Sequence, residues 1–395
     1  MNILFVSQYY PDSIIKTCLS VSKIGLNWAA HNLSLAIIRG FEECRISPYI
    51  LNIAHMGSFP AFAKCPWVPG CQDRNVQSIS YINIAYYKRI DTCRRVTQAI
   101  LKWCQETEDK KIILFYNINY LSSIIPVKKA FPDTKAVLLL TDLPEYRAHK
   151  NKFLSAINEW ISPEEKERKG NRFNYIDGYV LLNSQMIERL PIGEKPWMLM
   201  EGIYYDEITL SEKEKEPHKI LMYTGNLDER YGIGELLDAF KEIEDSDYRL
   251  WIRGNGRLAS LVKERSQEDS RILYLNQMSR EELMEREQKS TLLINPVLSS
   301  QEFTQFFFPS KTLEYMASGT PTLMAKLSCM PQEYHSHLFF FDDETPTGIA
   351  KRIQEICSKP QEELQAFGQS ASQFVLQEKN PQKQVSKILN FFYKL

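Results

Sequence analysis

Residues 219–240 read KILMYTGNLDERYGIGELLDAF, and this stretch decides how the second half of the chain is organised. Its first residues, Lys219–Thr224, are mostly apolar and predict a short buried strand. Residues 225–232, GNLDERYG, form a glycine-containing loop, and Ile233–Ile243 predicts a helix. A buried strand that leads through a short loop into a helix is the repeating unit of a parallel α/β sheet.

The same alternation of strands and helices recurs along the whole chain. In the second half, further strands are predicted at Arg249–Arg253, Ile272–Leu275, Leu292–Asn295 and Thr322–Ala325. In the first half, they are predicted at Asn2–Ser7, Tyr49–Ile53, Ile112–Tyr116, Ala136–Thr141 and Gly178–Leu182. Amphipathic segments separate these strands, so the fold class is α/β with two Rossmann-like halves.

The length of the chain fits two domains. A chain of 395 residues exceeds the ~250–300 residues at which single hydrophobic cores stop growing. The polar segment Tyr204–His218, with SEKEKEPHK at its centre, is the best linker candidate. We therefore predict an N-terminal domain over 1–203, a second domain over 204–378 and an amphipathic helix within 379–395.

Composition is typical of a soluble globular protein, with 44% hydrophobic and 25% charged residues. It excludes disordered, collagen-like and coiled-coil chains. No apolar run approaches the ~20 residues of a membrane-spanning helix, and Met1–Val6 reads as a buried strand and not as a signal peptide. The eight cysteines include no Cys-x-x-Cys pair, so we expect reduced thiols and a cytoplasmic location.

The net charge of −1 argues against nucleic acid as a partner, but it hides an asymmetry. Residues 1–200 hold 25 Lys and Arg against 18 Asp and Glu, which leaves 23 and 31 of the totals of 48 and 49 for the remainder. The basic half predicts peripheral contact with an anionic membrane at its inner face. A basic helix around Lys88, Arg89, Arg94 and Arg95 would make that contact, or would simply be a solvated face.

The stretch FPSKTLEYMASGTPTL at 308–323 predicts an anion site at a helix start. Pro309-Ser310 can begin a helix, whose free N–H groups and dipole attract an anion. Lys311 adds a positive charge in the first turn, where it is unfavourable for the helix alone. Glu314 lies on the same face and suits the hydroxyls of a ribose. The alternative is an ordinary Lys–Glu surface pair.

Two glycine turns follow predicted strands, at the sheet edge where parallel α/β folds bind ligands. Gly225, directly after the strand Lys219–Thr224, would let a phosphate approach the backbone closely. The turn at 254–256, GNG, is weaker evidence, because a tight turn alone explains it. Neither turn is a dinucleotide fingerprint or a Walker loop.

These motifs resemble retaining GT-B-fold glycosyltransferases of the family 4 group. FPSKTLEYMASGTPTL resembles their donor-site helix, in the form found in a bacterial polysaccharide-assembly branch with the pattern PSK…EYMA-G-P. YTGNLDERYGIGELLDAF at 223–240 resembles the glycine loop and first helix of the donor domain, and LWIRGNGRL at 250–258 resembles the next strand and turn. LLLTDLPE at 138–145 resembles a strand-end segment of the branch, shortened by one residue. The resemblance covers most of 215–325, and the first half by topology only.

The resemblance implies a fold and an activity. The fold is GT-B, with two Rossmann-like domains facing a cleft and the helix Pro381–Leu395 crossing back onto the N-terminal domain. The activity is transfer of a sugar from a nucleotide-sugar donor, with retention, to a glycan or lipid-linked acceptor in cell-surface polysaccharide synthesis. No cofactor and no metal are implied, since the nucleotide-sugar is a co-substrate.

The resemblance also assigns donor-binding residues. Glu314 takes the ribose role of the second glutamate in the family's E-x7-E motif. Ser310, Lys311 and the loop that starts with Gly225 and Asn226 would hold the diphosphate. Lys311 would also act in catalysis, because its charge and the helix start offset the negative charge of the leaving group.

Two positions depart from the family pattern. Phe306 stands where the first glutamate of E-x7-E is expected, which puts the contacts to the donor sugar in doubt; Glu302 or Gln305 could substitute for it from a shifted loop. Tyr231 stands where a basic residue usually precedes the last glycine of the donor loop. Arg230 beside it would then supply the charge to the donor.

Acceptor-binding residues are fewer. Asp142, at a strand end, would orient the acceptor or receive its proton, unless it only caps a turn. Glu145 is a weaker candidate of the same kind. His31, near the start of the first helix, would contact the acceptor, with a hydrogen-bonded and partly buried histidine as the alternative.

Three functions fit these residues. The first is a retaining glycosyltransferase. The second is a nucleotide-sugar epimerase of related architecture, which needs more acid–base groups around the sugar than this sequence offers. The third is a non-catalytic nucleotide-sugar-binding partner of a transferase, which the departure at Phe306 leaves open. Hydrolysis of the donor without an acceptor separates the first two from the third, and epimerisation of a nucleotide-sugar alone separates the second from the first.

Overall fold

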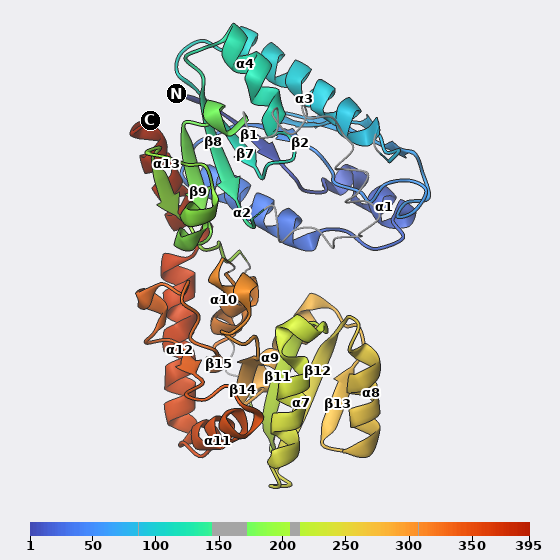
Figure 1. Ribbon diagram of the computed structural model, residues 1–395, viewed down its shortest axis with the longest axis vertical. Helices are drawn as coiled ribbons and strands as arrows, with labels where there is room; N and C mark the ends of the chain where they lie inside the picture. Colours follow the sequence, from blue (N-terminus) through green and yellow to red (C-terminus); the bar gives the residue numbers. More distant parts are fainter. Residues whose placement is uncertain (86, 144–171, 206–213, 307) are drawn as a thin grey trace. The chain divides into compact units, whose positions relative to one another are not determined.

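The computed structural model describes residues 1–85, 87–143, 172–205, 214–306 and 308–395. The chain divides into two compact units (Figure 1). The first unit comprises Met1–Tyr205 together with Pro381–Leu395, and the second comprises Asp206–Asn380.

The first unit is built on an eight-stranded sheet with the order β10-β9-β8-β7-β1-β2-β5-β4. All pairs are parallel except β4 with β5, which form a hairpin at one edge. The strands are β1 (Asn2–Ser7), β2 (Tyr49–Asn52), β4 (Cys71–Asp73), β5 (Val76–Ser78), β7 (Lys111–Tyr116), β8 (Lys135–Leu140), β9 (Gly178–Leu181) and β10 (Trp197–Leu199). A separate pair, β3 (Trp67–Val68) and β6 (Tyr81–Ile82), is antiparallel.

Helices cover both faces of this sheet (Figure 1). They are α1 (Asp12–Val21), α2 (Trp28–Glu43), α3 (Tyr87–Glu106), α4 (Ile124–Ala130) and α13 (Pro381–Tyr393). The terminal helix α13 completes the core of the first unit, because its apolar face joins the same cluster as β1 and β7. It approaches α2 closely at Gly40, where an added Cβ atom would lie 2.4 Å from Val385 Cγ2. The predicted return of the C-terminal helix onto the N-terminal domain is therefore observed.

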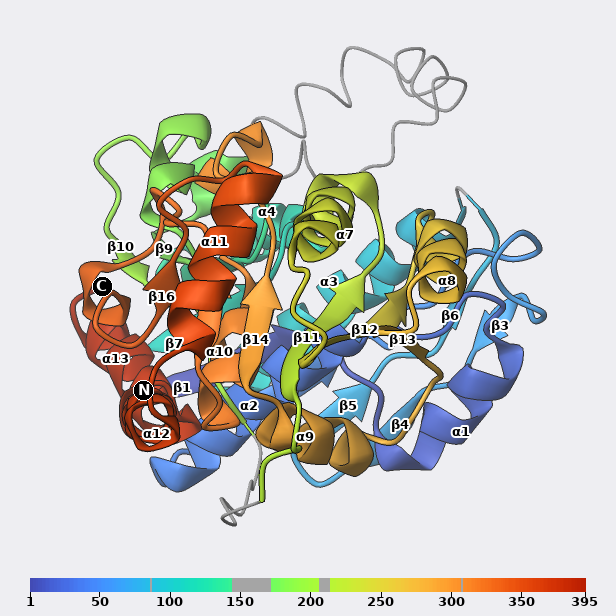
Figure 2. The same ribbon diagram turned by 90° about the horizontal axis from the view of Figure 1, so that it is seen from below.

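The second unit has a six-stranded, fully parallel sheet with the order β13-β12-β11-β14-β15-β16. Its strands are β11 (Lys219–Asn226), β12 (Tyr248–Asn255), β13 (Ile272–Leu275), β14 (Leu292–Asn295), β15 (Thr322–Met324) and β16 (Phe339–Phe340). Its helices are α7 (Ile233–Glu242), α8 (Ala259–Glu268), α9 (Arg280–Lys289), α10 (Ser310–Ala317), α11 (Pro346–Cys357) and α12 (Gln361–Glu378). In Figure 2, α7, α8 and α11 lie on one face of the sheet and α9, α10 and α12 on the other.

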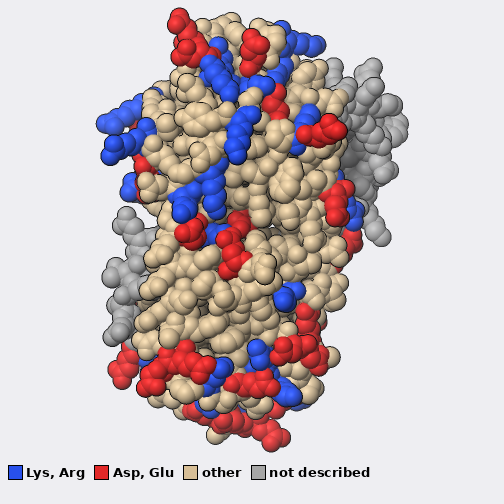
Figure 3. Space-filling view, turned by 90° about the vertical axis from the view of Figure 1, so that its left-hand side faces the viewer, with Lys and Arg blue, Asp and Glu red and all other residues tan. Residues whose placement is uncertain are grey.

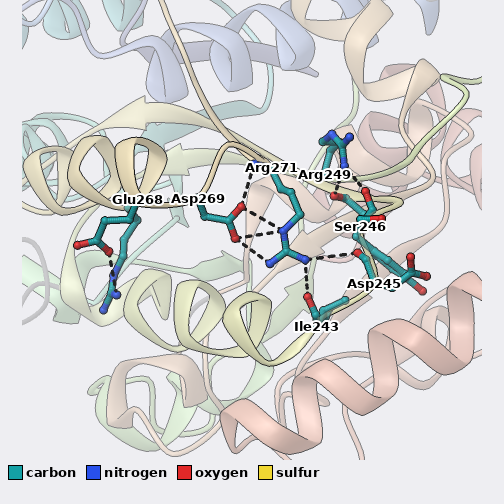
Figure 4. Close-up of polar contacts among 9 residues, drawn as sticks. Ile243, Asp245, Ser246, Arg249, Glu268, Asp269 and Arg271 are labelled. Carbon is teal, nitrogen blue, oxygen red and sulfur yellow. Dashed lines mark hydrogen bonds and ion pairs between the residues drawn. The ribbon is translucent and has the colours of Figure 1, made fainter.

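A polar cluster fastens the edge of the second unit (Figure 4). Arg271 Nη2 donates to Asp269 Oδ2 over 2.7 Å, and Arg271 Nη1 donates to the carbonyl oxygen of Ile243 at the end of α7. This cation therefore ties the residues before β13 to the helix between β11 and β12. The role is structural, since every partner belongs to the scaffold.

The two units differ in the charged side chains on their surfaces. On the face drawn in Figure 3, Lys and Arg side chains are frequent over the first unit, and Asp and Glu side chains gather at the end of the second unit. None of the described helices has both the length and the apolar character that crossing a membrane requires.

Candidate functional site

Helix α10 begins as the sequence predicts, at Ser310 after Pro309. Pro309 provides no side-chain cap, and Ser310 is exposed; the N–H of Thr312 donates to the carbonyl oxygen of Pro309 over 2.8 Å. Lys311 Nζ lies 2.9 Å from Glu314 Oε2, and each side chain is about one-third exposed. The i,i+3 ion pair of the alternative interpretation is thus present, and it places a cation and a carboxylate together at a helix start.

A buried hydrogen-bond network lies behind this pair and joins three elements of the second unit. Thr224, near the end of β11, donates from Oγ1 to Glu287 Oε1 on α9 over 3.1 Å. The backbone N–H of Thr224 donates to Tyr315 Oη on α10 over 2.7 Å, and Tyr315 donates to the carbonyl oxygen of Thr224 over 3.1 Å. Because Gly225 follows Thr224 directly, this network fixes the start of the glycine loop relative to α10.

Glu287 is the titratable group of this network, and only 4% of it is exposed. Burial raises its pKa to about 7, while Lys311 lowers the pKa and Glu314 raises it. Its charge therefore changes near neutral pH and is coupled to the ion pair on α10. Sequence reasoning missed Glu287, because it lies in the polar run EREQK at 285–289, which reads as a solvated helix face.

The glycine loop differs from its predicted form. Strand β11 continues through Gly225 and Asn226, which pair with Gly254 and Asn255 of β12. An added Cβ atom at Gly254 would lie 1.8 Å from the carbonyl oxygen of Gly225, so the strand pairing requires a glycine at position 254. The expectation that the strand ends before Gly225 is wrong.

The loop ends at Gly232, whose φ of +73° lies in the left-handed region. An added Cβ atom there would lie 1.9 Å from the carbonyl oxygen of Pro296, which follows β14. The glycine loop therefore packs directly against the carboxyl end of the neighbouring strand, and a side chain at this position would push the two apart.

Arg230 is held on the same loop by aromatic contacts. Its Nη2 donates to Tyr231 Oη over 2.9 Å, and its guanidinium lies 5.7 Å from the centre of the Phe303 ring. Phe306 is only 4% exposed, so its side chain belongs to the core. Glu302 and Gln305, the proposed substitutes for the missing glutamate, are exposed on the short helix before it.

The predicted acceptor residues belong to the first unit. Asp142 follows β8, is partly exposed and accepts from Thr141 Oγ1 over 3.1 Å. His31 is buried on α2, where its Nδ1 accepts from the backbone N–H of Tyr10 over 3.1 Å. Burial lowers the pKa of His31, and Asp12 opposes that shift. Glu145 lies outside the described residues.

Comparisons with known proteins address the class of protein. Residues 206–374 match the family model described as glycosyl transferases group 1. The chain carries a glycosyltransferase domain on a GT-B scaffold. No curated protein matches it by sequence.

Solved structures show the scaffold of this glycosyltransferase. Sucrose-phosphate synthase from Thermosynechococcus elongatus matches with a TM-score of 0.67 at 13% identity, over 100% of this chain and 99% of that chain. An α,α-trehalose-phosphate synthase (UDP-forming) from Burkholderia vietnamiensis matches with a TM-score of 0.63 at 11% identity, over 100% and 99%. Anabaena HepE in complex with UDP matches with a TM-score of 0.60 at 13% identity, over 100% of both chains. The predictions of a glycosyltransferase and of two Rossmann-like domains are confirmed.

No group of three or more His, Cys, Asp or Glu side chains is placed to hold a metal ion among the described residues.

Proposed function

We propose that this glycosyltransferase moves a sugar from a nucleotide-sugar donor to a glycan or lipid-linked acceptor, with retention at the anomeric carbon and without a metal ion. The observation that carries the proposal is the Lys311–Glu314 pair at the start of α10, within the glycosyltransferase group 1 domain. Two structural neighbours, one in complex with UDP and one UDP-forming, favour a uridine nucleotide.

Each donor-binding residue has a chemical task in this proposal. Glu314 accepts hydrogen bonds from the ribose hydroxyls. The N–H groups of Ser310 and Lys311, the Gly225–Asn226 backbone and Arg230 hold the diphosphate. As the bond between the anomeric carbon and the diphosphate breaks, Lys311 offsets the charge that develops on the leaving oxygen.

On the acceptor side, Asp142 orients the attacking hydroxyl or receives its proton as the new glycosidic bond forms. His31 and Glu145 are assigned to acceptor contacts. The basic character of the first half supports an acceptor that is presented at the inner face of an anionic membrane, in the synthesis of a cell-surface polysaccharide. Incorporation of sugar into membrane lipid extracts of a deletion strain, with and without the gene, tests this part.

Calorimetry with UDP, GDP and ADP tests the donor site. We expect Glu314→Ala and Lys311→Ala each to weaken binding of the preferred diphosphate at least about tenfold, which corresponds to about 1.4 kcal/mol. Lys359→Ala is the matched control, because Lys359 forms an ion pair with Glu363, four residues later, elsewhere in the second unit. Unchanged affinity in both α10 variants would overturn the donor assignment.

The buried Phe306 favours a second candidate, a non-catalytic protein that binds the nucleotide-sugar for a partner transferase. This candidate predicts tight binding of the donor without its hydrolysis. Slow release of free sugar from the donor in the absence of acceptor would reject the binder, since only an enzyme cleaves the glycosyl bond.

A further inference from the structure

The first unit contains a cavity of about 460 Å³, a volume typical of ligand pockets. It lies at the carboxyl ends of β2 and β7, because His55 follows β2 and Ile118 to Tyr120 follow β7. Parallel α/β sheets bind their ligands at this edge. Helix α3 completes the wall with Lys88 and Arg89, and Arg172 completes it from a later segment of the chain. We call it the basic cavity.

Charge in the basic cavity is of one sign. Lys88, Arg89 and Arg172 line it, and none of the described residues that line it is Asp or Glu. The carboxylate of Asp91 on the same helix is already engaged, since it accepts from the backbone N–H of Ile82 over 2.9 Å and from Arg95 Nε over 3.0 Å. Among the described residues of the wall, no carboxylate therefore neutralises these cations.

Arg172 shows this lack of compensation most clearly. Its side chain is buried, with 8% of the residue exposed, and its Nε atom has no hydrogen-bond partner among the described residues. Burial and the nearby Arg89 both lower the pKa of Arg172. A buried guanidinium that faces a second cation is costly without an anion to pair with.

Lys88 on α3 is a second cation whose pKa is lowered by burial. Burial lowers its pKa to about 8. Its ammonium group donates to the carbonyl oxygen of Met56 and lies 5.6 Å from the centre of the Tyr81 ring. The helix that looks like a solvated basic face in the sequence thus lines a cavity with Lys88 and Arg89, and its Arg95 is paired with Asp91.

We propose that Lys88, Arg89 and Arg172 bind a phosphate or diphosphate group carried by the acceptor. Two guanidinium groups and one ammonium group match the oxygens of such a group, which Arg binds through paired N–H donors. Ser58 and Asn119 add neutral polar groups to the wall. That the anion belongs to the acceptor rests on the proposed function; the anion site itself rests only on the cavity.

Calorimetry with inorganic pyrophosphate tests the site, in a Lys311→Ala background that disables the proposed donor site. We expect Arg172→Met and Arg89→Gln each to weaken binding at least about tenfold. Arg94→Gln is the matched control, because Arg94 is exposed on the same helix and does not line the cavity. Equal affinity in all three variants would overturn the proposal. Nucleotide binding by the Lys311 and Glu314 variants is measured in a separate experiment. A failure of the donor-site proposal can therefore be distinguished from a failure of the basic-cavity proposal.

Thermal unfolding guards against a variant that simply misfolds. Without an anion, Arg172→Met should melt at or above the temperature of the parent chain, because it removes a buried cation that lacks a partner. Pyrophosphate should raise the melting temperature of the parent chain and leave that of Arg172→Met unchanged. An equal rise in both would contradict the assignment.

Two further arms identify the source of the phosphate. One measures binding of glucose 6-phosphate, and the other measures flotation with phosphatidylcholine vesicles with and without phosphatidic acid. Dependence on Arg172 in the first arm indicates a soluble phosphorylated acceptor, and dependence in the second indicates a lipid-borne one. Binding in either arm that is unaffected by Arg172→Met would count against the site.

Discussion

The two units bury titratable groups of opposite sign, and they compensate them differently. In the second unit, Glu287 is buried behind the Lys311–Glu314 pair, so a cation and a second carboxylate both act on it. In the first unit, Lys88 and Arg172 share the basic cavity with a third cation, Arg89, and no carboxylate belongs to the described part of its wall. The buried carboxylate of the second unit thus has a cation near it, whereas the described wall of the basic cavity holds no opposite charge for its cations.

This difference has a functional meaning. A balanced pair such as Lys311–Glu314 must exchange its internal contact for contacts with a ligand, so the net gain on binding is reduced. An uncompensated cluster has no such contact to lose, and an entering anion relieves repulsion that is already present. The first unit should therefore respond to simple anions more strongly than the second, which needs a whole nucleotide.

The comparison between the two units is tested most strongly by Glu287→Gln, which should change the pH dependence of the free energy of unfolding. The pKa of Glu287 is raised from 4.5 to about 7 by burial, so the folded chain holds its proton where the unfolded chain has lost it. That contribution to stability is complete below pH 4.5 and is lost as pH rises through about 7, by about 3 kcal/mol. Urea unfolding of the parent chain and of Glu287→Gln across this range should show their difference in stability change by that amount.

Glu285→Gln is the control for this measurement, because Glu285 lies on the same helix but is exposed, and it pairs with Lys289. It should leave the pH dependence intact. If Glu287→Gln follows the parent chain at every pH, then the pKa of Glu287 is not raised in the folded state, and burial does not outweigh the nearby cation as described.

A smaller effect is expected in the first unit, where the affinity for pyrophosphate should depend on the protonation of Lys88. Since the pKa of Lys88 is about 8, its protonated fraction falls from about nine-tenths at pH 7 to about one-tenth at pH 9. Affinity for pyrophosphate should fall over this range by up to about tenfold more than in Lys88→Met, which carries no titrating group there. Titration calorimetry of both chains in parallel cancels the ionisation of pyrophosphate itself.

Other ionisable groups also surround Lys88 and bear on this profile. They are His55, Arg89, Tyr120 and Arg172 in the wall and Tyr81 beneath the ammonium group. Burial raises the pKa of Tyr120 and of Tyr81, so neither gains charge between pH 7 and 9. A decline that Lys88→Met reproduces in full would assign the titration to another group.

Sequence patterns predicted the local features well. Pro309-Ser310 begins α10 as expected, and Gly319 follows its end with a φ of +78°. The parallel sheets and the terminal helix also follow from apolar periodicity, because burial on a sheet or on one helix face leaves a regular spacing. The basic helix expected around Lys88, Arg89, Arg94 and Arg95 is observed as α3, which contains all four residues.

Features that depend on tertiary contacts could not be predicted. Glu287 and Thr224 are 63 residues apart, and only the pairing of β11 with β14 brings their elements together. Arg172 and Arg89 are likewise distant in sequence and meet because their segments border one sheet edge. A single charged residue in a polar run carries no signal that distinguishes burial from exposure.

The smallest expected effect concerns the Lys311–Glu314 pair itself. Both side chains are about one-third exposed, so water screens their attraction, and such pairs contribute about 0–1 kcal/mol to stability. A double-mutant cycle with Lys311→Ala and Glu314→Ala, followed by urea unfolding, should give a coupling energy within that range. The same cycle in saturating nucleoside diphosphate should differ, because each residue then also contacts the ligand. A coupling well above about 1 kcal/mol in the free chain would mean that the pair is chiefly a structural fastening of α10, and it would weaken the argument that these two charges are held ready for a donor.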